Sequence, residues 1–359
     1  MLKQKLNELF AGYGYRRFRL SKFEEYDLYA GNKDFLKSGQ LITFTDLDGS
    51  LLALKPDITL SIVKNNRGED DKVFYNEMVY RAKDHHYREI PQAGVECLGN
   101  VDVYAEAEVT ALACRALACI ADSYVLRVSD VGFLQSVYEE EQIPESLYPA
   151  LSEAVSYKNT DEITKLCRAG KISNDTAGKL KALISLYKPL KQGIDEAARL
   201  TGEAEKGELE HLRRIAEILE AFGVIDHVYL DFTLINSMDY YNGLIFQGAV
   251  ASVPVTVLSG GRYDRLPKKM GKNISAIGFA VYMDAVENSL SPSRPYDADI
   301  LITYTQDSDF VRLARIVEAY EKKGSTVRTV RRDAAKNSVR EKRFCAVRTM
   351  EEAEREAGI

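Results

Sequence analysis

The pattern of apolar and polar residues divides the chain into segments with different periods. Over residues 1–20 the apolar residues recur every three to four positions, which predicts a helix. Those on its apolar face are Leu2, Leu6, Leu9 and Phe10. Gly12 and Gly14 then interrupt the pattern, because glycine weakens a helix interior. From residue 26 to residue 64 the pattern changes to short strands and turns.

Two hairpins are predicted in the next part of the chain. In the first, "LITFTD" and "SLLALKPD" flank an Asp48-Gly49 turn, and the second strand ends at Pro56. "ITLSIVKNN" then predicts a short helix. In the second, "KVFYNEMVYRA" and "REIPQAGVECLG" form an antiparallel pair around the polar loop "KDHHY".

Helical sequence dominates the middle of the chain. Residues 105–124 predict a long helix, and residues 139–222 contain few strand formers, so we interpret them as an inserted helical region. Its clearest helix spans 203–222 and is stopped by Gly223. The apolar stripe of that helix consists of Leu209, Leu212, Ile215, Leu219 and Phe222.

Strands resume at "HVYLDFTL", "GLIFQGAV" and "VPVTVLSGG", and a last helix of the main body is predicted from about Gly278. The proline- and serine-bearing segment 289–297 indicates a boundary. Beyond it, strand, helix and strand follow one another, as in a small α/β unit with a parallel sheet. The predicted class is therefore α+β: an antiparallel sheet flanked by helices over 1–290, with a small C-terminal α/β domain over 296–359.

Composition narrows the function classes. The chain has 359 residues, 45% of them hydrophobic, and no apolar run of about 18 residues that would predict a membrane span. The first ten residues lack the apolar centre of a secretion signal, so we expect a cytoplasmic protein. Its five cysteines are scattered without a C-x-x-C pair, and of its four histidines only His85 and His86 are adjacent. Neither a disulfide framework nor a metal site is expected.

The charge distribution argues against a large nucleic-acid surface, because the net charge is −6. The exception is the segment 322–348, which carries ten lysines and arginines against Asp333 and Glu341. A solvated helix face, a docking surface for an acidic partner and an RNA-binding surface would each explain this basic segment.

Polar residues gather in two segments, one at the end of the first hairpin and one in the second hairpin. Asp57 and Thr59 follow a strand in "LKPDIT", and Arg81, Arg88, Gln92 and Glu96 lie in "YRAKDHHYREIPQAGVE". Because side chains alternate along a strand, Gln92 and Glu96 share one face. An amide and a carboxylate beside arginines could bind a small cation or zwitterion. A solvent-exposed strand face is the alternative.

Two further segments concentrate unusual residues. "LINSMDYYNGLIFQG" (234–248) contains Asp239, Tyr240 and Tyr241 before an Asn-Gly pair. Taken alone it is more typical of an ordinary strand and turn than of a site, since tyrosine favours strands and Asn-Gly favours hairpins. "LSGGRYDRL" (258–266) has two glycines that permit close backbone approach, and Arg262 and Asp264 are positioned to pair locally.

In this order the four segments resemble the core of class II aminoacyl-tRNA synthetases, and within that class histidyl-tRNA synthetase, over about residues 1–290. "PQAGVECLG" and "MDYYNGLIF" are similar to the two histidine-binding signatures of that family, and "SGGRYD" and "AIGFAVYMD" follow as expected. The resemblance implies a histidine site. Its amino-group ligands would be Asp57, Thr59, Gln92 and Glu96, with Tyr240 and Tyr241 at the imidazole and Arg88 and Asp239 beside them.

The chain departs from that family where adenylation chemistry requires charge. Asn236 stands in place of the catalytic arginine of the histidine signature, and Ala285 in place of the arginine of the third class motif. Lys83 replaces an acid of the second motif. Arginines that stabilise charge on a transferring phosphate contribute orders of magnitude in rate. The resemblance therefore implies a chain that has lost catalysis and kept the histidine side.

This combination resembles the regulatory subunits of ATP phosphoribosyltransferase, which are synthetase paralogues without catalytic activity. The resemblance implies no cofactor, a hetero-oligomer (classically a hetero-octamer) with the short-form catalytic subunit, histidine feedback inhibition and self-association as a dimer. An active histidyl-tRNA synthetase and a synthetase-like tRNA-binding module are the alternatives. The tail of about 60 residues is shorter than the anticodon-binding domain of the synthetases.

Overall fold

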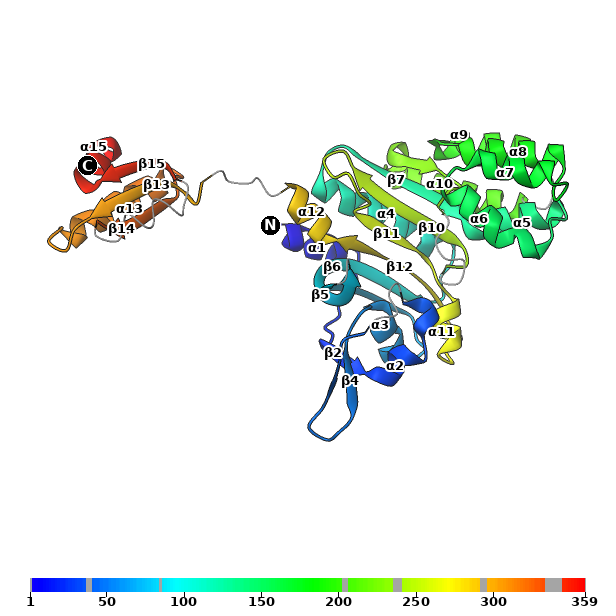
Figure 1. The fold of residues 1–359 in the computed structure, drawn as a ribbon, viewed down its shortest axis with the longest axis horizontal. Helices are drawn as coiled ribbons and strands as arrows, with labels where there is room; N and C mark the ends of the chain where they lie inside the picture. The colour runs from blue at the N-terminus through cyan, green and yellow to red at the C-terminus, as the bar shows by residue number, and fades with distance from the viewer. Residues whose placement is uncertain are drawn as a thin grey trace. The chain divides into compact units, whose positions relative to one another are not determined.

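The structure is a computed structural model that describes residues 2–36, 41–83, 86–201, 206–234, 241–290, 296–332 and 344–358. The chain forms two compact units, residues 1–290 and 291–359. No described helix is long and apolar enough to cross a membrane. The larger unit is built around one sheet, with helices against both of its faces (Figure 1).

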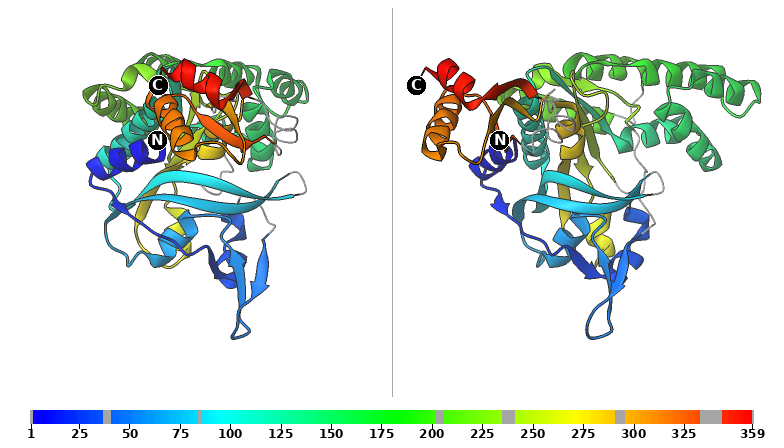
Figure 2. Two further views of the ribbon diagram at one scale, coloured as in Figure 1. Left: turned by 90° about the vertical axis from the view of Figure 1, so that its left-hand side faces the viewer. Right: turned by 60° about the vertical axis from the view of Figure 1, so that its left-hand side comes forward.

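The central sheet has nine strands in the order β1-β5-β6-β12-β11-β10-β7-β9-β8. Neighbouring strands are antiparallel except for the pairs β1–β5 and β7–β9. The long hairpin of β5 and β6 is cyan in Figure 2. The strand bounds are β1 Arg16–Arg17, β5 Asp71–Lys83, β6 His86–Gly99, β7 Tyr124–Asp130, β8 Lys188–Pro189, β9 Val228–Leu230, β10 Leu244–Val250, β11 Leu258–Arg262 and β12 Ser275–Tyr282.

One face of the sheet is covered by α4 (Val103–Ile120) and α1 (Leu2–Gly12). Asp102 begins α4 by accepting a hydrogen bond from the backbone N–H of Ala105, at 2.9 Å. Twelve residues of this helix are buried, and Leu112 is among the fully buried ones. Contact with the sheet is close, because a Cβ at Gly248 would lie 2.7 Å from Leu117 Cδ1. This packing forms the largest apolar core of the molecule.

The opposite face of the sheet is covered by short elements from the first third of the chain, and α11 (Arg265–Lys269) packs against α3. A small antiparallel sheet, β2-β4-β3, lies next to them and projects from the body (Figure 1). The bounds are β2 Phe23–Glu25, α2 Tyr26–Ala30, η1 Lys33–Phe35, β3 Thr43–Thr45, β4 Leu51–Leu54 and α3 Thr59–Asn65. Several large apolar side chains of the β3–β4 hairpin are exposed, including Leu47 at its tip.

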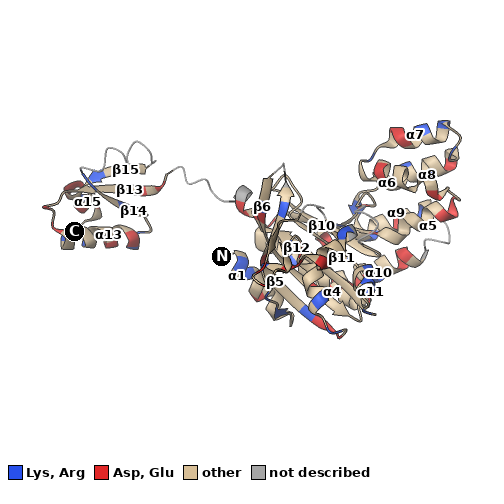
Figure 3. Ribbon diagram, turned by 60° about the horizontal axis from the view of Figure 1, so that its bottom comes forward, with Lys and Arg blue, Asp and Glu red and all other residues tan. Residues whose placement is uncertain are grey.

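Helices dominate residues 131–221 and gather at the β7–β9 end of the sheet (Figures 1 and 2). Basic and acidic residues are interspersed on them (Figure 3), as expected for solvated helix faces. The bounds are α5 Val131–Glu140, η2 Glu145–Leu147, α6 Tyr148–Ser156, α7 Thr160–Arg168, α8 Asn174–Ser185, α9 Leu190–Leu200, α10 Lys206–Ala221 and η3 Ile225–His227.

The smaller unit contains a parallel three-stranded sheet in the order β14-β13-β15. Two helices supply apolar residues that pack against it, and the last helix begins with a capping box formed by Thr349 and Glu352. The bounds are β13 Ala298–Tyr304, α13 Phe310–Lys322, β14 Val327–Arg331, β15 Phe344–Thr349 and α15 Met350–Ala357.

The structure confirms the predicted fold class, the two hairpins and the helical middle region. The helix expected from about Gly278 is wrong, because residues 275–282 form β12 and α12 runs over Met283–Leu290. β12 pairs with β6 and β11 on both sides, and its buried position overrides the helical pattern. The first helix is also shorter than predicted, since it ends at Gly12.

The core packing of α4 leads to a stability prediction. Leu112→Ala should lower the free energy of unfolding by roughly 2–5 kcal/mol, because it removes buried methyl groups and leaves a cavity. Leu47→Ala, the same change at the exposed hairpin tip, should shift it by less than about 0.5 kcal/mol. Urea unfolding followed by circular dichroism measures both. Equal losses in the two variants would contradict this packing.

Candidate functional site

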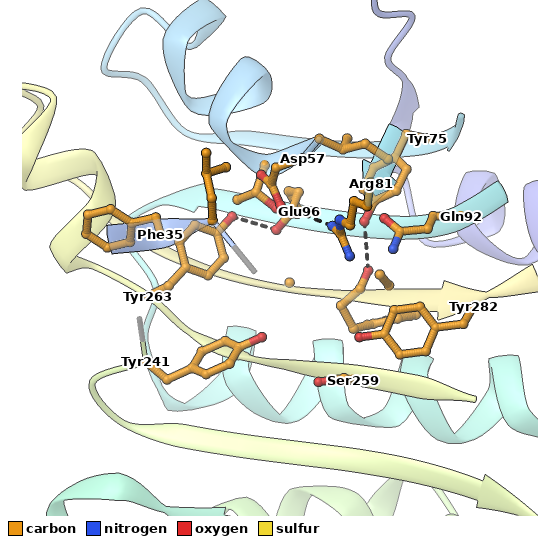
Figure 4. A pocket seen from close by; sticks show the side chains of 16 residues that line it. Phe35, Asp57, Tyr75, Arg81, Gln92, Glu96, Tyr241, Ser259, Tyr263 and Tyr282 are labelled. Atoms are coloured by element: carbon orange, nitrogen blue, oxygen red, sulfur yellow. Dashed lines mark hydrogen bonds and ion pairs between the residues drawn. The ribbon is translucent and has the colours of Figure 1, made fainter. Parts of the chain in front are cut away.

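A cavity of about 100 Å³ lies on the side of the central sheet that faces α3 (Figure 4). A single water needs roughly 10–15 Å³ on this measure, so the space suits a small organic molecule. Its lining residues are Phe35, Leu36, Asp57, Ile58, Thr59, Tyr75, Arg81, Gln92, Glu96, Tyr241, Ser259, Tyr263, Gly278, Phe279, Ala280 and Tyr282.

Glu96 of β6 is the most deeply buried charged group of the cavity, with 2% of its surface exposed. Thr59 Oγ1 donates a hydrogen bond to Glu96 Oε1 at 2.7 Å. Tyr263 OH donates to Glu96 Oε2 at 2.5 Å, from the turn that follows β11. The carboxylate is thus oriented by two neutral hydroxyls and contacts no cation among the described residues.

Burial controls the protonation of this carboxyl. Removal from water raises the pKa of Glu96 to about 8, although the hydrogen bonds from Tyr263 and Thr59 lower it, and the nearby charge of Asp57 raises it further. Near neutral pH the empty cavity therefore holds a largely protonated Glu96. A positively charged or N–H-donating ligand would favour the ionised form.

Asp57 lies closer to the opening, with 18% of its side chain exposed. Its Oδ1 accepts a hydrogen bond from the N–H of Leu60 at 2.9 Å, which fixes the carboxylate at the first turn of α3. Arg81 Nε donates to the Pro56 carbonyl at 2.7 Å, and Arg81 Nη2 lies 3.8 Å from Asp57 Oδ2. One arginine and one acid therefore stand side by side at the opening.

Tyrosines form much of the remaining wall, with Tyr75, Tyr241, Tyr263 and Tyr282 around the same space (Figure 4). Burial raises the pKa of Tyr241 well above its usual value, so the phenol stays neutral. Tyr75 OH donates weakly to the Phe279 carbonyl, at 3.4 Å. Phenols and ring faces of this kind suit a flat polar ring.

The strand backbones approach the cavity closely at two glycines. A Cβ at Gly278 would lie 1.8 Å from Glu96 Oε2, and a Cβ at Gly261 would lie 2.8 Å from Tyr241 Cδ1. A side chain at either position would displace Glu96 or Tyr241. Gly261 of "LSGGRYDRL" therefore leaves the space that Tyr241 occupies.

Gln92 is 4% exposed, and its side-chain amide makes no hydrogen bond with the part of the chain that the structure describes. It faces the cavity four residues from Glu96 along β6, opposite Glu77 of β5. An amide offers both donors and acceptors, so Gln92 is available to a zwitterion. The exposed-face alternative for this strand is wrong, because Gln92 and Glu96 are both buried.

The structure brings together five of the residues expected at a histidine site: Asp57, Thr59, Gln92, Glu96 and Tyr241. Arg88 is not among the lining residues; it shares the face of Gln92 but is exposed near the loop end of the hairpin. Asp239 and Tyr240 lie outside the described residues, as does Asn236. The backbone of Lys83 ends β5 but its side chain is likewise outside the description, and Ala285 packs half-buried against the core.

Several lining residues were not predicted from sequence, among them Tyr75, Ser259, Tyr263 and Tyr282. Tyr263 alone had a nearby signal, because it stands between Arg262 and Asp264. These two do pair, at 2.8 Å, as expected.

The chemistry of the site suits binding better than bond making. Two carboxyls, an arginine, an amide and several phenols face one small space, a set that can hold an amino acid by its charges and its side chain. The described residues contain no cluster of three or more histidines, cysteines or acids that could hold a metal ion.

Comparisons with known proteins agree with this geometry. The family model described as histidyl-tRNA synthetase matches residues 1–286. A relative named ATP phosphoribosyltransferase regulatory subunit, from Bacillus cereus (strain AH820), is 28% identical over 344 residues, covering 91% of this chain and 81% of the relative.

Two solved structures share the fold. One, described as an ATP phosphoribosyltransferase regulatory subunit/histidyl-tRNA synthetase from Bacillus halodurans C, has a TM-score of 0.74 at 24% identity, over 97% of this chain and 92% of that chain. The ATP phosphoribosyl transferase (HisG:HisZ) complex from Thermotoga maritima includes a chain with a TM-score of 0.64 at 19% identity, over 79% of this chain and 96% of that one. The resemblance drawn from the sequence is confirmed: the chain belongs to the histidyl-tRNA synthetase family.

Proposed function

We propose that this chain is a non-catalytic regulatory subunit of ATP phosphoribosyltransferase that binds histidine in the cavity below α3. The observation that supports this proposal most is the cavity, which is lined by Asp57, Gln92, Glu96, Tyr241 and Tyr263. The curated relative from Bacillus cereus carries the name of such a subunit, which supports the assignment.

The arrangement of charges suggests how histidine would lie. Asp57 and Arg81 stand at the opening and suit the ammonium and carboxylate of the amino acid, and Gln92 lies beside Arg81 (Figure 4). Glu96 is more deeply buried, and we assign it to a ring N–H instead of the ammonium that the family resemblance implied, because it lies between phenols. Histidine carries all of these groups, whereas an aliphatic amino acid would leave Glu96 without a donor from the ligand.

Loss of adenylation is part of the proposal. The third-motif position is Ala285, whose methyl group packs against the core and cannot neutralise a phosphate. Asn236 and Lys83 stand at the other two altered positions. Without fixed positive charge at a transferring phosphate, a synthetase loses most of its rate. The kept cavity and the altered motifs together favour a histidine sensor over an enzyme.

The partner is inferred from the relatives. The Thermotoga maritima structure is a complex of the two transferase proteins, which supports a hetero-oligomer for this chain. The proposal includes the short-form catalytic subunit as partner, self-association as a dimer, feedback inhibition by histidine and a cytoplasmic location. By linkage, histidine inhibits only if it binds the inactive assembly more tightly than the active one.

The buried acid predicts a pH dependence of stability. Since the pKa of Glu96 is raised to about 8, the native state holds an extra proton between about pH 4.5 and 8. Stability of the ligand-free chain should therefore fall as the pH rises through this window, by on the order of 5 kcal/mol at about 1.4 kcal/mol per pKa unit. Glu96→Gln, which is neutral and similar in shape, should remove this part of the slope in urea unfolding at several pH values. Glu217→Gln, at an exposed acid, should keep it.

An unchanged slope in Glu96→Gln would contradict the protonated state of the empty site.

Histidine binding tests the cavity directly. Gln92→Ala and Glu96→Ala should each weaken binding of L-histidine by about tenfold or more, because each removes a buried partner of the ligand. Glu89→Ala, at an exposed residue on the other face of the same strand, should change affinity by less than about twofold. Isothermal titration calorimetry measures all three. Unchanged affinity in both cavity variants would refute the assignment.

Reconstitution with a short-form transferase tests the partner. We expect the mixture to synthesise phosphoribosyl-ATP and the catalytic subunit alone to be inactive. Histidine should inhibit the mixture. Glu96→Ala should still activate the transferase but should make it insensitive to histidine, since only the cavity is changed. Failure to activate any short-form transferase would overturn the proposal, and histidine-dependent ATP–pyrophosphate exchange would favour an active synthetase instead.

A further inference from the structure

A second buried polar cluster lies on the opposite face of the sheet from the cavity. Glu106, in the first turn of α4, is 1% exposed in its side chain. Its Oε1 accepts a hydrogen bond from Arg262 Nη1 at 3.0 Å. Its Oε2 pairs with Nε2 of His211, which lies on α10 of the helical region. One buried carboxylate thus joins the sheet to a helix of the inserted region.

Arg262 connects this cluster to the cavity through the alternation of β11. Arg262 and Asp264 pair with each other on one side of the strand end, while Tyr263 between them points into the cavity (Figure 4). Asp264 Oδ1 also accepts the N–H of Ala276 at 2.9 Å, and Arg262 Nη2 donates to Ser275 Oγ at 3.2 Å. Tyr263 therefore stands between two anchored residues.

Arg262 and Asp264 also hold the backbone next to Tyr241. The N–H of its neighbour Asn242 donates to the Arg262 carbonyl at 3.0 Å. Asn242 Oδ1 accepts the N–H of Asp264 at 2.7 Å, and its Nδ2 donates to Asp264 Oδ2 at 3.3 Å. Both phenols that flank Glu96 thus depend on the position of Arg262 and Asp264.

We propose that His211, Glu106 and Arg262 form a relay, defined by these three residues, through which α10 positions Tyr263 and Tyr241 in the ligand cavity. The relay gives the helical region control over the affinity of the site. Its members are positioning residues, because none of them lines the cavity. The expected effect of the relay on histidine affinity rests on the proposed function. Its expected effect on local opening at the end of β11 does not.

The charge of the relay depends on pH through His211. Hydrogen bonding to Glu106 raises the pKa of His211, burial opposes this, and the charges of Glu106 and Asp130 raise it further while Arg262 lowers it. Glu208 faces the same region from α10, near Asp130. Because the folded pKa exceeds the ordinary value of about 6.5, the charged relay is intact below that pH and weakens as pH rises through the folded value.

Hydrogen exchange in the full, ligand-free chain tests the relay. His211→Gln should speed exchange of the amides of Asn242, Tyr263 and Asp264 by about fivefold or more at about pH 6, because local opening becomes easier. The difference from wild type should shrink as the pH is raised through the folded pKa of His211, because the relay then loses the positive charge of the imidazole. His227→Gln is the matched control, because His227 stacks on Tyr124 outside the relay.

A second variant and a second readout separate positioning from general destabilisation. Glu106→Gln should give the same local effect, and His211→Gln should add little to it in the double variant. Affinity for L-histidine at about pH 6 should fall about fivefold in His211→Gln and stay unchanged in His227→Gln. Equal exchange in His211→Gln and wild type, or faster exchange spread over the whole unit, would overturn the relay.

A difference that persists undiminished after the His211 imidazole has lost its proton, as followed by NMR titration, would overturn its titration. If wild-type protein does not bind histidine, the proposed function fails while the exchange result still decides the relay.

Discussion

Burial of Glu96 is the constraint on which the rest of the site depends. A carboxyl in a nearly closed, tyrosine-lined space is stable only if it is neutral, or if a ligand supplies a donor or a charge. Thr59 and Tyr263 orient it without neutralising it. The cavity is consequently complementary to a small cationic or N–H-bearing molecule. This complementarity to a ligand is the main chemical feature of the cavity.

The central sheet makes this arrangement possible by packing against elements on both faces. α4 covers one face with an apolar surface and carries Glu106 and Glu108 into it, where Lys72 pairs with Glu108 at 2.6 Å. α3 and the phenols enclose the cavity on the other face. Glycines at 261 and 278 let strand backbones come close to Tyr241 and Glu96. The same strands therefore form the wall of the cavity on one face of the sheet and the packing surface for helices on the other.

The sequence predicted much of this, for physical reasons that differ by element. The hairpins had strong turn signals and alternation, and Asp57, Thr59, Gln92 and Glu96 sit in local patterns that one strand or one helix start brings together. β12 was missed because a glycine- and alanine-rich central strand, buried on both faces, lacks alternation. Tyr75, Ser259 and Tyr282 join the cavity only through strand order. Arg88 shares the cavity face of β6 but is exposed near the loop end of the hairpin, so its place at a histidine site stays a prediction.

The most direct test of the central claim is a crystal structure of the chain grown with saturating L-histidine. Our account predicts the amino acid in the cavity below α3, with a ring nitrogen within hydrogen-bonding distance of Glu96 and its ammonium near Asp57. The ring should lie against Tyr241 and Tyr263. An empty cavity at saturating histidine, or histidine bound elsewhere on the chain, would contradict it.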